Sequence, residues 1–124
     1  MRIERELMRG AGPTAVLRLL SAREMYGYEL VETLAARTEG VLAMGQSTLY
    51  PLLYNLEAKG LIEATWHEAD NGRERKYYRL TGKGKKKLKA DTEQWNRLAG
   101  AMQAIGVLNT PTPPRAGHLA GGSA

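Results

Sequence analysis

The sequence predicts a mainly α-helical protein with one small β-hairpin and a long C-terminal helix. Three segments within residues 12–60 repeat apolar residues at helical spacing. Two later segments alternate apolar and polar residues on either side of the turn signal Asp70-Asn71-Gly72, a pattern typical of a hairpin. A final apolar pattern, over residues 82–105, has heptad spacing.

The composition fits one globular domain. The chain has 124 residues, of which 25% are charged and 43% hydrophobic. It contains no cysteine, which excludes disulfides, thiolate metal sites and thiol catalysis. No apolar run approaches the roughly 18–20 residues that span a bilayer. The N-terminus also lacks the apolar region of a secretory signal, so we expect a cytoplasmic protein.

We expect no enzyme activity, no cofactor and no metal site. The sequence shows no paired carboxylates, nucleophile elbow or phosphate-binding loop. His67 and His118 are isolated from each other and from other potential ligands in the sequence. Because a metal ion needs several converging ligands, we interpret both as surface histidines.

The N-terminal region predicts an arm followed by a helix. Ile3 and Leu7 have i, i+4 spacing within the arm, residues 1–11. Gly12 followed by Pro13 favours a helix start there, because a proline at the first helical position loses no needed hydrogen bond.

Two further helices are predicted before the hairpin. The second covers residues 28–40 and ends at Gly40. The third begins at Ser47, a favourable N-cap, and ends at Gly60, where a left-handed residue is needed.

The register of the hairpin follows from its apolar residues. A two-residue Asn-Gly loop would place Trp66 opposite Tyr77. The burial pattern instead places Trp66 on the same face as Tyr78 and Leu80, which requires a loop of odd length or a bulge. We favour the second register and interpret Trp66 as a core residue under the hairpin. Thr81 is then a suitable cap for the C-terminal helix.

The third helix has an unusual outer face. Its core face consists of leucines, namely Leu49, Leu52, Leu53 and Leu56. The opposite face is uncharged and consists of Ser47, Tyr50, Pro51, Tyr54, Asn55 and Ala58. Hydroxyls, an amide and amphipathic rings suit the hydrogen-bonding edges and methyl groups of a DNA major groove. A protein partner is the alternative, because tyrosine-rich faces also form good interfaces.

Basic residues are concentrated in and after the hairpin. Nine of the 18 Lys and Arg residues lie within residues 73–89. Such a concentration suits a polyanion, although a solubilising surface has the same composition. Three helices followed by a basic hairpin form the pattern of a winged helix-turn-helix, in which the third helix enters the major groove and the wing contacts phosphates. We expect Arg73, Arg75 and Lys76 to make those wing contacts.

Three sequence motifs resemble the PadR-like bacterial transcriptional regulators. They are GYEL at residues 27–30, STLYPLLYNLEAKGLI at residues 47–62 and GRERKYYRLTGKG at residues 72–84. The resemblance covers residues 7–95 and implies a winged helix-turn-helix repressor that dimerises through its C-terminal helix. Some members of the family respond to phenolic or planar hydrophobic compounds. With one C-terminal helix, this chain resembles the short type.

The resemblance and the patterns together give a predicted organisation. It comprises an arm or short separate helix at 1–11, a winged helix-turn-helix DNA-binding domain at 12–81, a dimerisation helix at 82–106 and a disordered tail at 107–124. The residues expected at double-stranded DNA are Tyr28, Gln46, Ser47, Thr48, Tyr50, Tyr54, Asn55, Arg73, Arg75 and Lys76. Many relatives carry basic residues where this chain has Tyr54 and Asn55, so the operator sequence does not follow from the family.

The predicted homodimer interface lies on the C-terminal heptads. The a and d positions are Leu88, Trp95, Leu98, Met102 and Ile105, interrupted at one d position by Asp91. Ile3 and Leu7 of the arm are expected to add to this interface. Trp95 near its dyad mate has two interpretations: it sandwiches a flat aromatic ligand, or it is interface core. The alternative for the whole chain is a winged-helix protein-interaction module without sequence-specific DNA binding.

Overall fold

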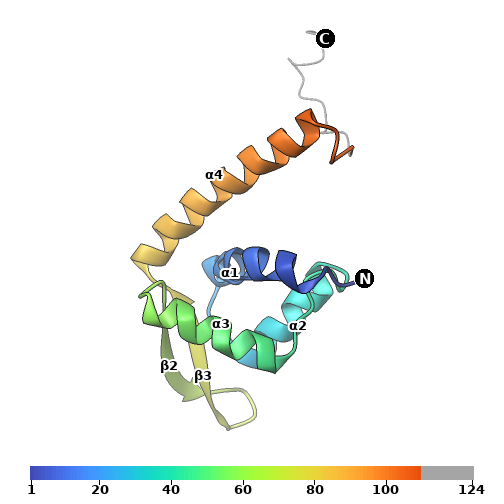
Figure 1. Ribbon diagram of the computed structural model, residues 1–124. Coiled ribbons are helices and arrows are strands. Elements are labelled where there is room, and N and C mark those ends of the chain that lie inside the picture. Colours follow the sequence, from blue (N-terminus) through green and yellow to red (C-terminus); the bar gives the residue numbers. More distant parts are fainter. Residues whose placement is uncertain (110–124) are drawn as a thin grey trace, which may run out of the picture. The chain divides into compact units, whose positions relative to one another are not determined.

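The computed structural model describes residues 1–109 and has the predicted mainly α-helical fold with a small sheet (Figure 1). The chain divides into two compact units, Met1–Glu93 and Gln94–Ala124. Its elements are α1 (Arg5–Ala22), β1 (Met25–Tyr26), α2 (Gly27–Arg37), α3 (Gln46–Ala58), β2 (Ile62–Glu68), β3 (Glu74–Leu80) and α4 (Gly82–Ala104). None of the helices in the described part is long and apolar enough to cross a membrane. Most of the predicted disordered tail, from residue 110 on, lies outside the described residues.

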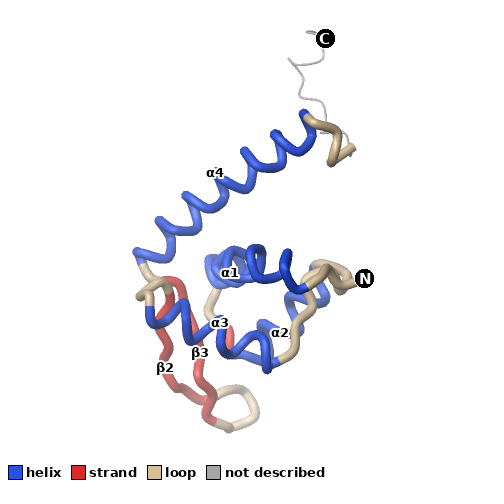
Figure 2. The backbone as a smooth tube through the Cα atoms, in the orientation of Figure 1, coloured by secondary structure: helices blue, strands red, loops and turns tan. Residues whose placement is uncertain are grey.

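The sheet is antiparallel, with strand order β1-β3-β2 (Figure 2). Trp66 pairs with Lys76 and Ala64 with Tyr78, so the register predicted from the burial pattern is confirmed. The loop at residues 69–73 has an odd number of residues, as that register requires. The hairpin β2–β3 is the wing of the domain.

The short strand β1 was not predicted. Tyr26-Gly27 reads in sequence as a simple break between helices, whereas Met25 pairs with Tyr78 and Tyr26 with Tyr77. A strand of two residues has no periodicity to detect. It forms because the edge of β3 that does not face β2 is free to pair with it, and this depends on the tertiary structure.

The predicted boundary between arm and first helix is wrong. α1 runs without interruption from Arg5 to Ala22 and contains Pro13. The proline removes one backbone hydrogen bond to the carbonyl four residues earlier. Residues on both sides of it, Met8 and Val16, are buried in the same core, and this packing holds the helix together across the proline. At α3, Gly45 rather than Ser47 is the N-cap, so the cap lies two residues earlier than predicted.

The hydrophobic core lies among α1, α2, α3 and the base of the sheet. Leu49, Leu53 and Leu56 are buried and Leu52 is partly buried, which confirms the predicted core face of the third helix. Fully burying one such side chain contributes about 1.5–3 kcal/mol. Tyr78 brings a hydroxyl into this core, and burial raises the pKa of Tyr78.

Trp66 is not a core residue, contrary to the prediction. Its face of β2 becomes more exposed towards the wing tip: Ile62 is buried, Ala64 is partly buried and Trp66 is 65% exposed. The predicted alternation is right, but it does not reveal how far along the strand the helices cover the sheet. Trp66 lies beyond that cover.

The start of α4 is joined to the end of α3 by a compact junction. Gly60 has a positive φ of 75° and ends the α3 region, as predicted. The Thr81 hydroxyl donates to the Gly60 carbonyl at 2.7 Å and accepts from the Gly84 N–H at 3.0 Å, so Thr81 is the predicted cap. Gly84 is buried, and a Cβ atom there would overlap the carbonyl oxygen of Leu61.

Replacing Gly84 with alanine should therefore destabilise the domain. The overlap is with backbone, which cannot rotate away, so we expect a loss of about 1–3 kcal/mol in the free energy of unfolding, measured by urea denaturation. Gly82→Ala is the matched control, because nothing lies within 4 Å of a Cβ atom at that position. A loss of equal size in both variants would contradict the junction.

Candidate nucleic-acid interface

The exposed surface of α3 carries the predicted uncharged side chains. Those exposed to solvent are Gln46, Ser47, Thr48, Tyr50, Pro51, Tyr54, Asn55 and Ala58. Tyr54 is the most open of the aromatic ones, at 76% exposure. The helix surface available to a partner thus presents hydroxyls, amides and two phenol rings, with no charge among them.

The Tyr50 ring packs directly against the backbone of Gly27. A Cβ atom at Gly27 would lie 2.5 Å from the Tyr50 hydroxyl and 2.7 Å from a ring carbon. The first residue of α2 must therefore lack a side chain for the Tyr50 ring to occupy its position. The glycine of the GYEL motif thus has a packing role at the contact of α2 with α3.

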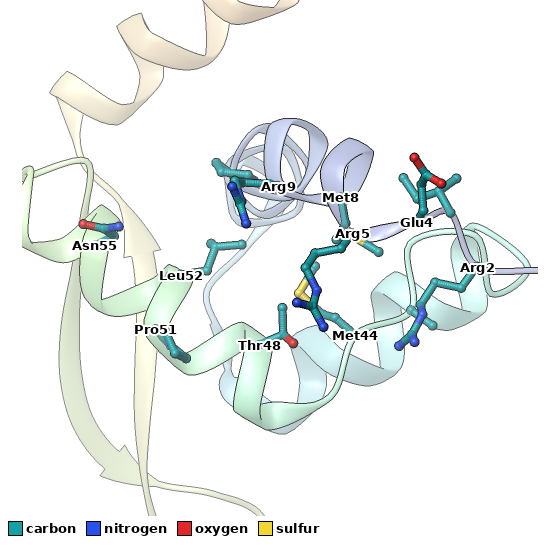
Figure 3. A pocket seen from close by; sticks show the side chains of 13 residues that line it. Arg2, Glu4, Arg5, Met8, Arg9, Met44, Thr48, Pro51, Leu52 and Asn55 are labelled. Carbon is teal, nitrogen blue, oxygen red and sulfur yellow. The ribbon is translucent and has the colours of Figure 1, made fainter.

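A cavity of about 810 Å³ borders α3 on the side that carries Thr48, Pro51 and Asn55 (Figure 3). α3 contributes Thr48, Pro51 and Asn55 to its lining, and the N-terminal part of the chain contributes Arg2, Arg5 and Arg9 among others. Sequence reasoning did not find these arginines. Their only signal in the sequence was the i, i+4 spacing of Arg5 and Arg9.

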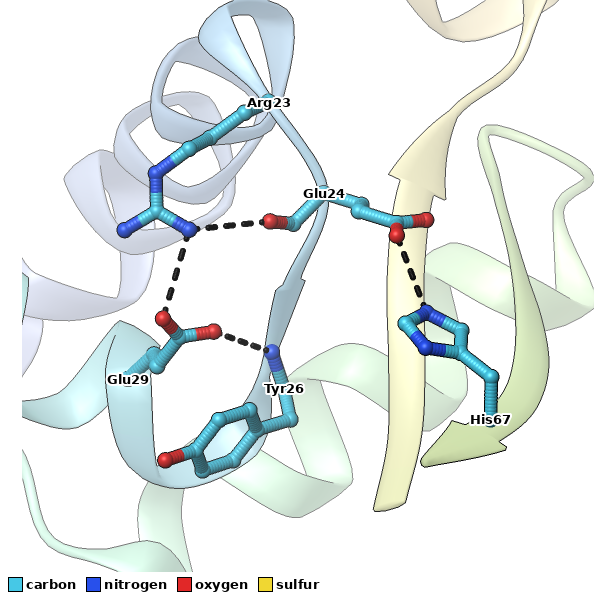
Figure 4. A network of polar contacts seen from close by, with 5 residues as sticks. All are labelled: Arg23, Glu24, Tyr26, Glu29 and His67. Atoms are coloured by element: carbon cyan, nitrogen blue, oxygen red, sulfur yellow. Dashed lines mark hydrogen bonds and ion pairs between the residues drawn. The ribbon is translucent and has the colours of Figure 1, made fainter. Parts of the chain in front are cut away.

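The start of α2 is fixed by a carboxylate. Glu29 accepts a hydrogen bond from the Tyr26 N–H at 3.1 Å and one from Arg23 at 3.3 Å (Figure 4). The neighbouring Tyr28 is 48% exposed, as a DNA-contacting residue must be. A hydrogen bond with Glu32, reinforced by the charge of that carboxylate, raises the pKa of Tyr28.

The three predicted wing cations have different environments. Arg73 is exposed in the tip loop and forms no ion pair within residues 1–109. The Arg75 guanidinium lies 4.4 Å from the centre of the Tyr26 ring, and its buried Nε has no hydrogen-bond partner among residues 1–109. The Lys76 Nζ atom lies 3.8 Å from a carboxylate oxygen of Glu57 in α3. Arg73 is therefore the most available of the three for a phosphate.

Stacked aromatic side chains connect the strands of the wing to β1. The His67 ring stacks on Tyr77 with centroids 3.7 Å apart, and Tyr77 meets Tyr26 edge to face at 5.4 Å. His67 also lies 2.9 Å from a carboxylate oxygen of Glu24 (Figure 4). His67 is thus not the isolated histidine expected from the sequence. Across residues 1–109, no three His, Cys, Asp or Glu side chains are arranged to hold a metal ion.

The predicted dimer residues fall into two groups. In the first unit, Ile3 and Leu88 are partly buried against the core of the chain itself, whereas Leu7 is 59% exposed. In the second unit Met102 is partly buried, and the exposed apolar side chains include Trp95, Leu98 and Ile105. Asp91, which interrupts the heptads, accepts a hydrogen bond from Lys87 at 2.9 Å.

Comparison with known proteins decides the family. The sequence model of the transcriptional regulator PadR-like family matches residues 16–90, more than half of the chain. The chain belongs to the PadR-like family of transcriptional regulators. A transcriptional regulator of Mycobacterium tuberculosis is 34% identical over 95 residues, which cover 77% of this chain and 85% of the relative.

Solved structures of PadR-like proteins have the same fold. A PadR family regulator from Eggerthella lenta is 35% identical, with a TM-score of 0.71 over 84% of this chain and 88% of that chain. A PadR-like regulator from Bacillus cereus is 29% identical, with a TM-score of 0.74 over 82% of this chain and 96% of that chain. These matches confirm the resemblance seen in the motifs. They make this PadR-like chain a DNA-binding transcription regulator, a kind of protein that is not an enzyme.

Gly27→Ala should disturb the exposed surface of α3 through Tyr50. We expect the added methyl group to displace the ring, lowering the free energy of unfolding by about 1–3 kcal/mol and weakening DNA binding. The same substitution in a Tyr50→Ala background should be milder, and this coupling is measured by a double-mutant cycle. Gly10→Ala, which meets nothing within 4 Å, is the control. Additive effects of the Gly27 and Tyr50 substitutions would argue against the contact.

Proposed function

We propose that the protein is a dimeric transcriptional repressor that inserts α3 into the major groove of an operator. One observation carries the proposal: the exposed surface of α3 is uncharged, and a basic wing follows it directly. A neutral surface of hydroxyls and amides suits base edges, whereas phosphates attract the cations beside it.

The exposed residues of α3 suit distinct contacts in that groove. Gln46, Ser47 and Thr48 form the first turn, where side chains and backbone N–H groups meet DNA in helix-turn-helix proteins. The Asn55 amide suits bidentate pairing with adenine. Tyr54 offers a ring for thymine methyl groups, and Tyr28 at the start of α2 suits a backbone phosphate.

The wing supplies electrostatic affinity in this proposal. Arg73 contacts a phosphate directly, because it is exposed at the tip and unpaired within the described part of the chain. Arg75 and Lys76 add positive potential from their partly buried positions and reorient when DNA is present. Binding through these cations releases counterions and therefore weakens with salt.

Dimerisation through α4 is the second part of the proposal. Exposed apolar side chains at heptad spacing, Trp95 and Leu98 among them, favour burial against a second copy of the helix. A two-fold dimer places its recognition helices about one helical turn of DNA apart, so the operator is roughly palindromic. Leu88 contributes less than the heptad pattern suggests, because it already packs on its own core.

Release by a small effector is the third part. Trp95 is 40% exposed, so part of its indole surface can contact a flat ligand. Two indoles related by a dyad would enclose a planar or phenolic compound. The alternative within the dimer is that Trp95 is interface core alone.

A protein-interaction module is the competing function for the whole chain. The tyrosines of α3 are as suitable for a protein partner as for DNA. Partner binding that is insensitive to salt, without affinity for promoter fragments, would support that alternative.

Removing the reading side chains should abolish sequence preference. Tyr54→Ala with Asn55→Ala is expected to cost about 1–3 kcal/mol, or roughly 5- to 150-fold, in affinity for DNA from upstream of the protein's own gene. Binding to mixed-sequence DNA should change little. Asn96→Ala, at an exposed position of α4, is the matched control, and fluorescence anisotropy gives both affinities. Unchanged preference in the double variant would refute the assignment of α3.

A fluorescence titration distinguishes the two roles of Trp95. The Trp66→Phe variant leaves Trp95 as the single tryptophan, and position 66 is exposed enough to tolerate the change. We expect saturable quenching by planar aromatic cations or phenolic acids, accompanied by release of DNA. Sedimentation checks that the variant keeps the parent's oligomeric state. If no compound of either class quenches Trp95, the residue serves only as interface core.

A further inference from the structure

Three arginines near the N-terminus face the recognition helix. Arg2, Arg5 and Arg9 are exposed, and none forms an ion pair within residues 1–109. They line the cavity beside α3, and Figure 3 shows Arg5 and Arg9 extending from α1 towards that helix. Glu4 also lines the cavity, but its carboxylate points away from α3 in the same view.

The arginines and the wing lie on opposite sides of α3. Thr48 and Asn55 line the cavity with the arginines, whereas Glu57 faces Lys76 of the wing. Glu57 follows Thr48 by nine positions, which at 3.6 residues per turn is about 180° around the helix. Tyr54 lies between these two directions, at about 120° from Thr48 and about 60° from Glu57. The exposed reading surface is thus bordered by cations on both sides.

This arrangement matches the two sugar-phosphate strands that border a major groove. A helix lying in the groove has a phosphate strand on each side of it. The wing accounts for one strand, and the predicted set of DNA contacts includes no cation for the other. The guanidinium groups of Arg5 and Arg9 match phosphate oxygens in charge and in donor geometry.

We propose that Arg5 and Arg9, assisted by Arg2, bind phosphates of the DNA strand on the α1 side of the recognition helix. The inference rests on the proposed function and extends it from a one-sided wing contact to a two-sided clamp. It also gives the groove between α1 and α3 a role, because a sugar-phosphate strand there would contact the arginines and the hydroxyl of Thr48.

Charge-matched variants test the clamp. Arg5→Gln with Arg9→Gln removes two charges next to α3, while Arg18→Gln with Arg37→Gln removes two exposed charges elsewhere in the first unit. Arg18 is nine positions from Arg9 and so about 180° away around α1. The ligand is a mixed-sequence duplex of about 30 base pairs, or three helical turns, because phosphate contacts do not depend on sequence.

The salt dependence of binding is the deciding measurement. For Arg5→Gln with Arg9→Gln we expect the slope of log affinity against log salt to fall by about 1 for each phosphate that an arginine no longer neutralises. Affinity near 0.1 M salt should fall at least roughly tenfold. The charge-matched control should lose much less, and Arg5→Lys with Arg9→Lys should retain most of the affinity, because a phosphate contact needs the charge.

The other outcomes separate the inference from the function on which it rests. Full affinity in the Arg5 and Arg9 variant, with parental DNA binding intact, would overturn the clamp and leave the repressor proposal standing. An equal loss in the charge-matched control would also overturn it, since the effect would then be that of net charge. Absence of salt-dependent DNA binding in the parent protein would overturn both proposals.

Discussion

The backbone around Leu61 is the constraint on which the arrangement of the first unit depends. Its N–H donates to the Leu56 carbonyl at 3.0 Å and so ends α3, while its own carbonyl accepts from the Thr81 N–H at 3.1 Å. The same oxygen accepts from the Thr81 hydroxyl and lies against Gly84, where no side chain fits. The end of the recognition helix, the base of the wing and the start of α4 therefore meet at one peptide group. A shift there would move the wing cations relative to the α3 surface.

The proposed function assigns phosphate attraction and base reading to different elements of this domain. The exposed surface of α3 is neutral, and its hydroxyls and amides suit discrimination between base edges. Cations lie beside it, in the wing and at the start of α1, where attraction to phosphates would contribute affinity without sequence information. An arginine in α3 would strengthen binding to any DNA as well as to the operator. A neutral helix bordered by cations keeps the two contributions separate.

Some of the wing's polar residues maintain its structure rather than lying open to solvent. Arg75 packs on Tyr26, which meets Tyr77, and Tyr77 stacks on His67. This series of contacts links all three strands, because Tyr26 belongs to β1, Tyr77 to β3 and His67 to β2. It favours a stiff wing, so that in the proposed complex the exposed Arg73 at its tip would meet DNA with little loss of conformational freedom. The buried Nε of Arg75 has no hydrogen-bond partner among residues 1–109, so a rearrangement that brings it to a phosphate oxygen would gain a hydrogen bond.

The sequence by itself determined the features that depend on near neighbours. The two faces of α3, the left-handed Gly60, the Thr81 cap and the register of the wing follow from periodicity, turn residues and capping chemistry, and the motifs indicated the family. Tertiary structure alone decided the continuity of α1 through Pro13, the existence of β1 and the exposure of Trp66. It also placed Arg5 and Arg9 beside α3, although they precede it by about forty positions in the sequence. The physical reason is that each of these features depends on which other segment packs against the one in question. The periodicity of a sequence indicates that one face of a helix or strand is apolar, but it does not identify the segment that covers this face.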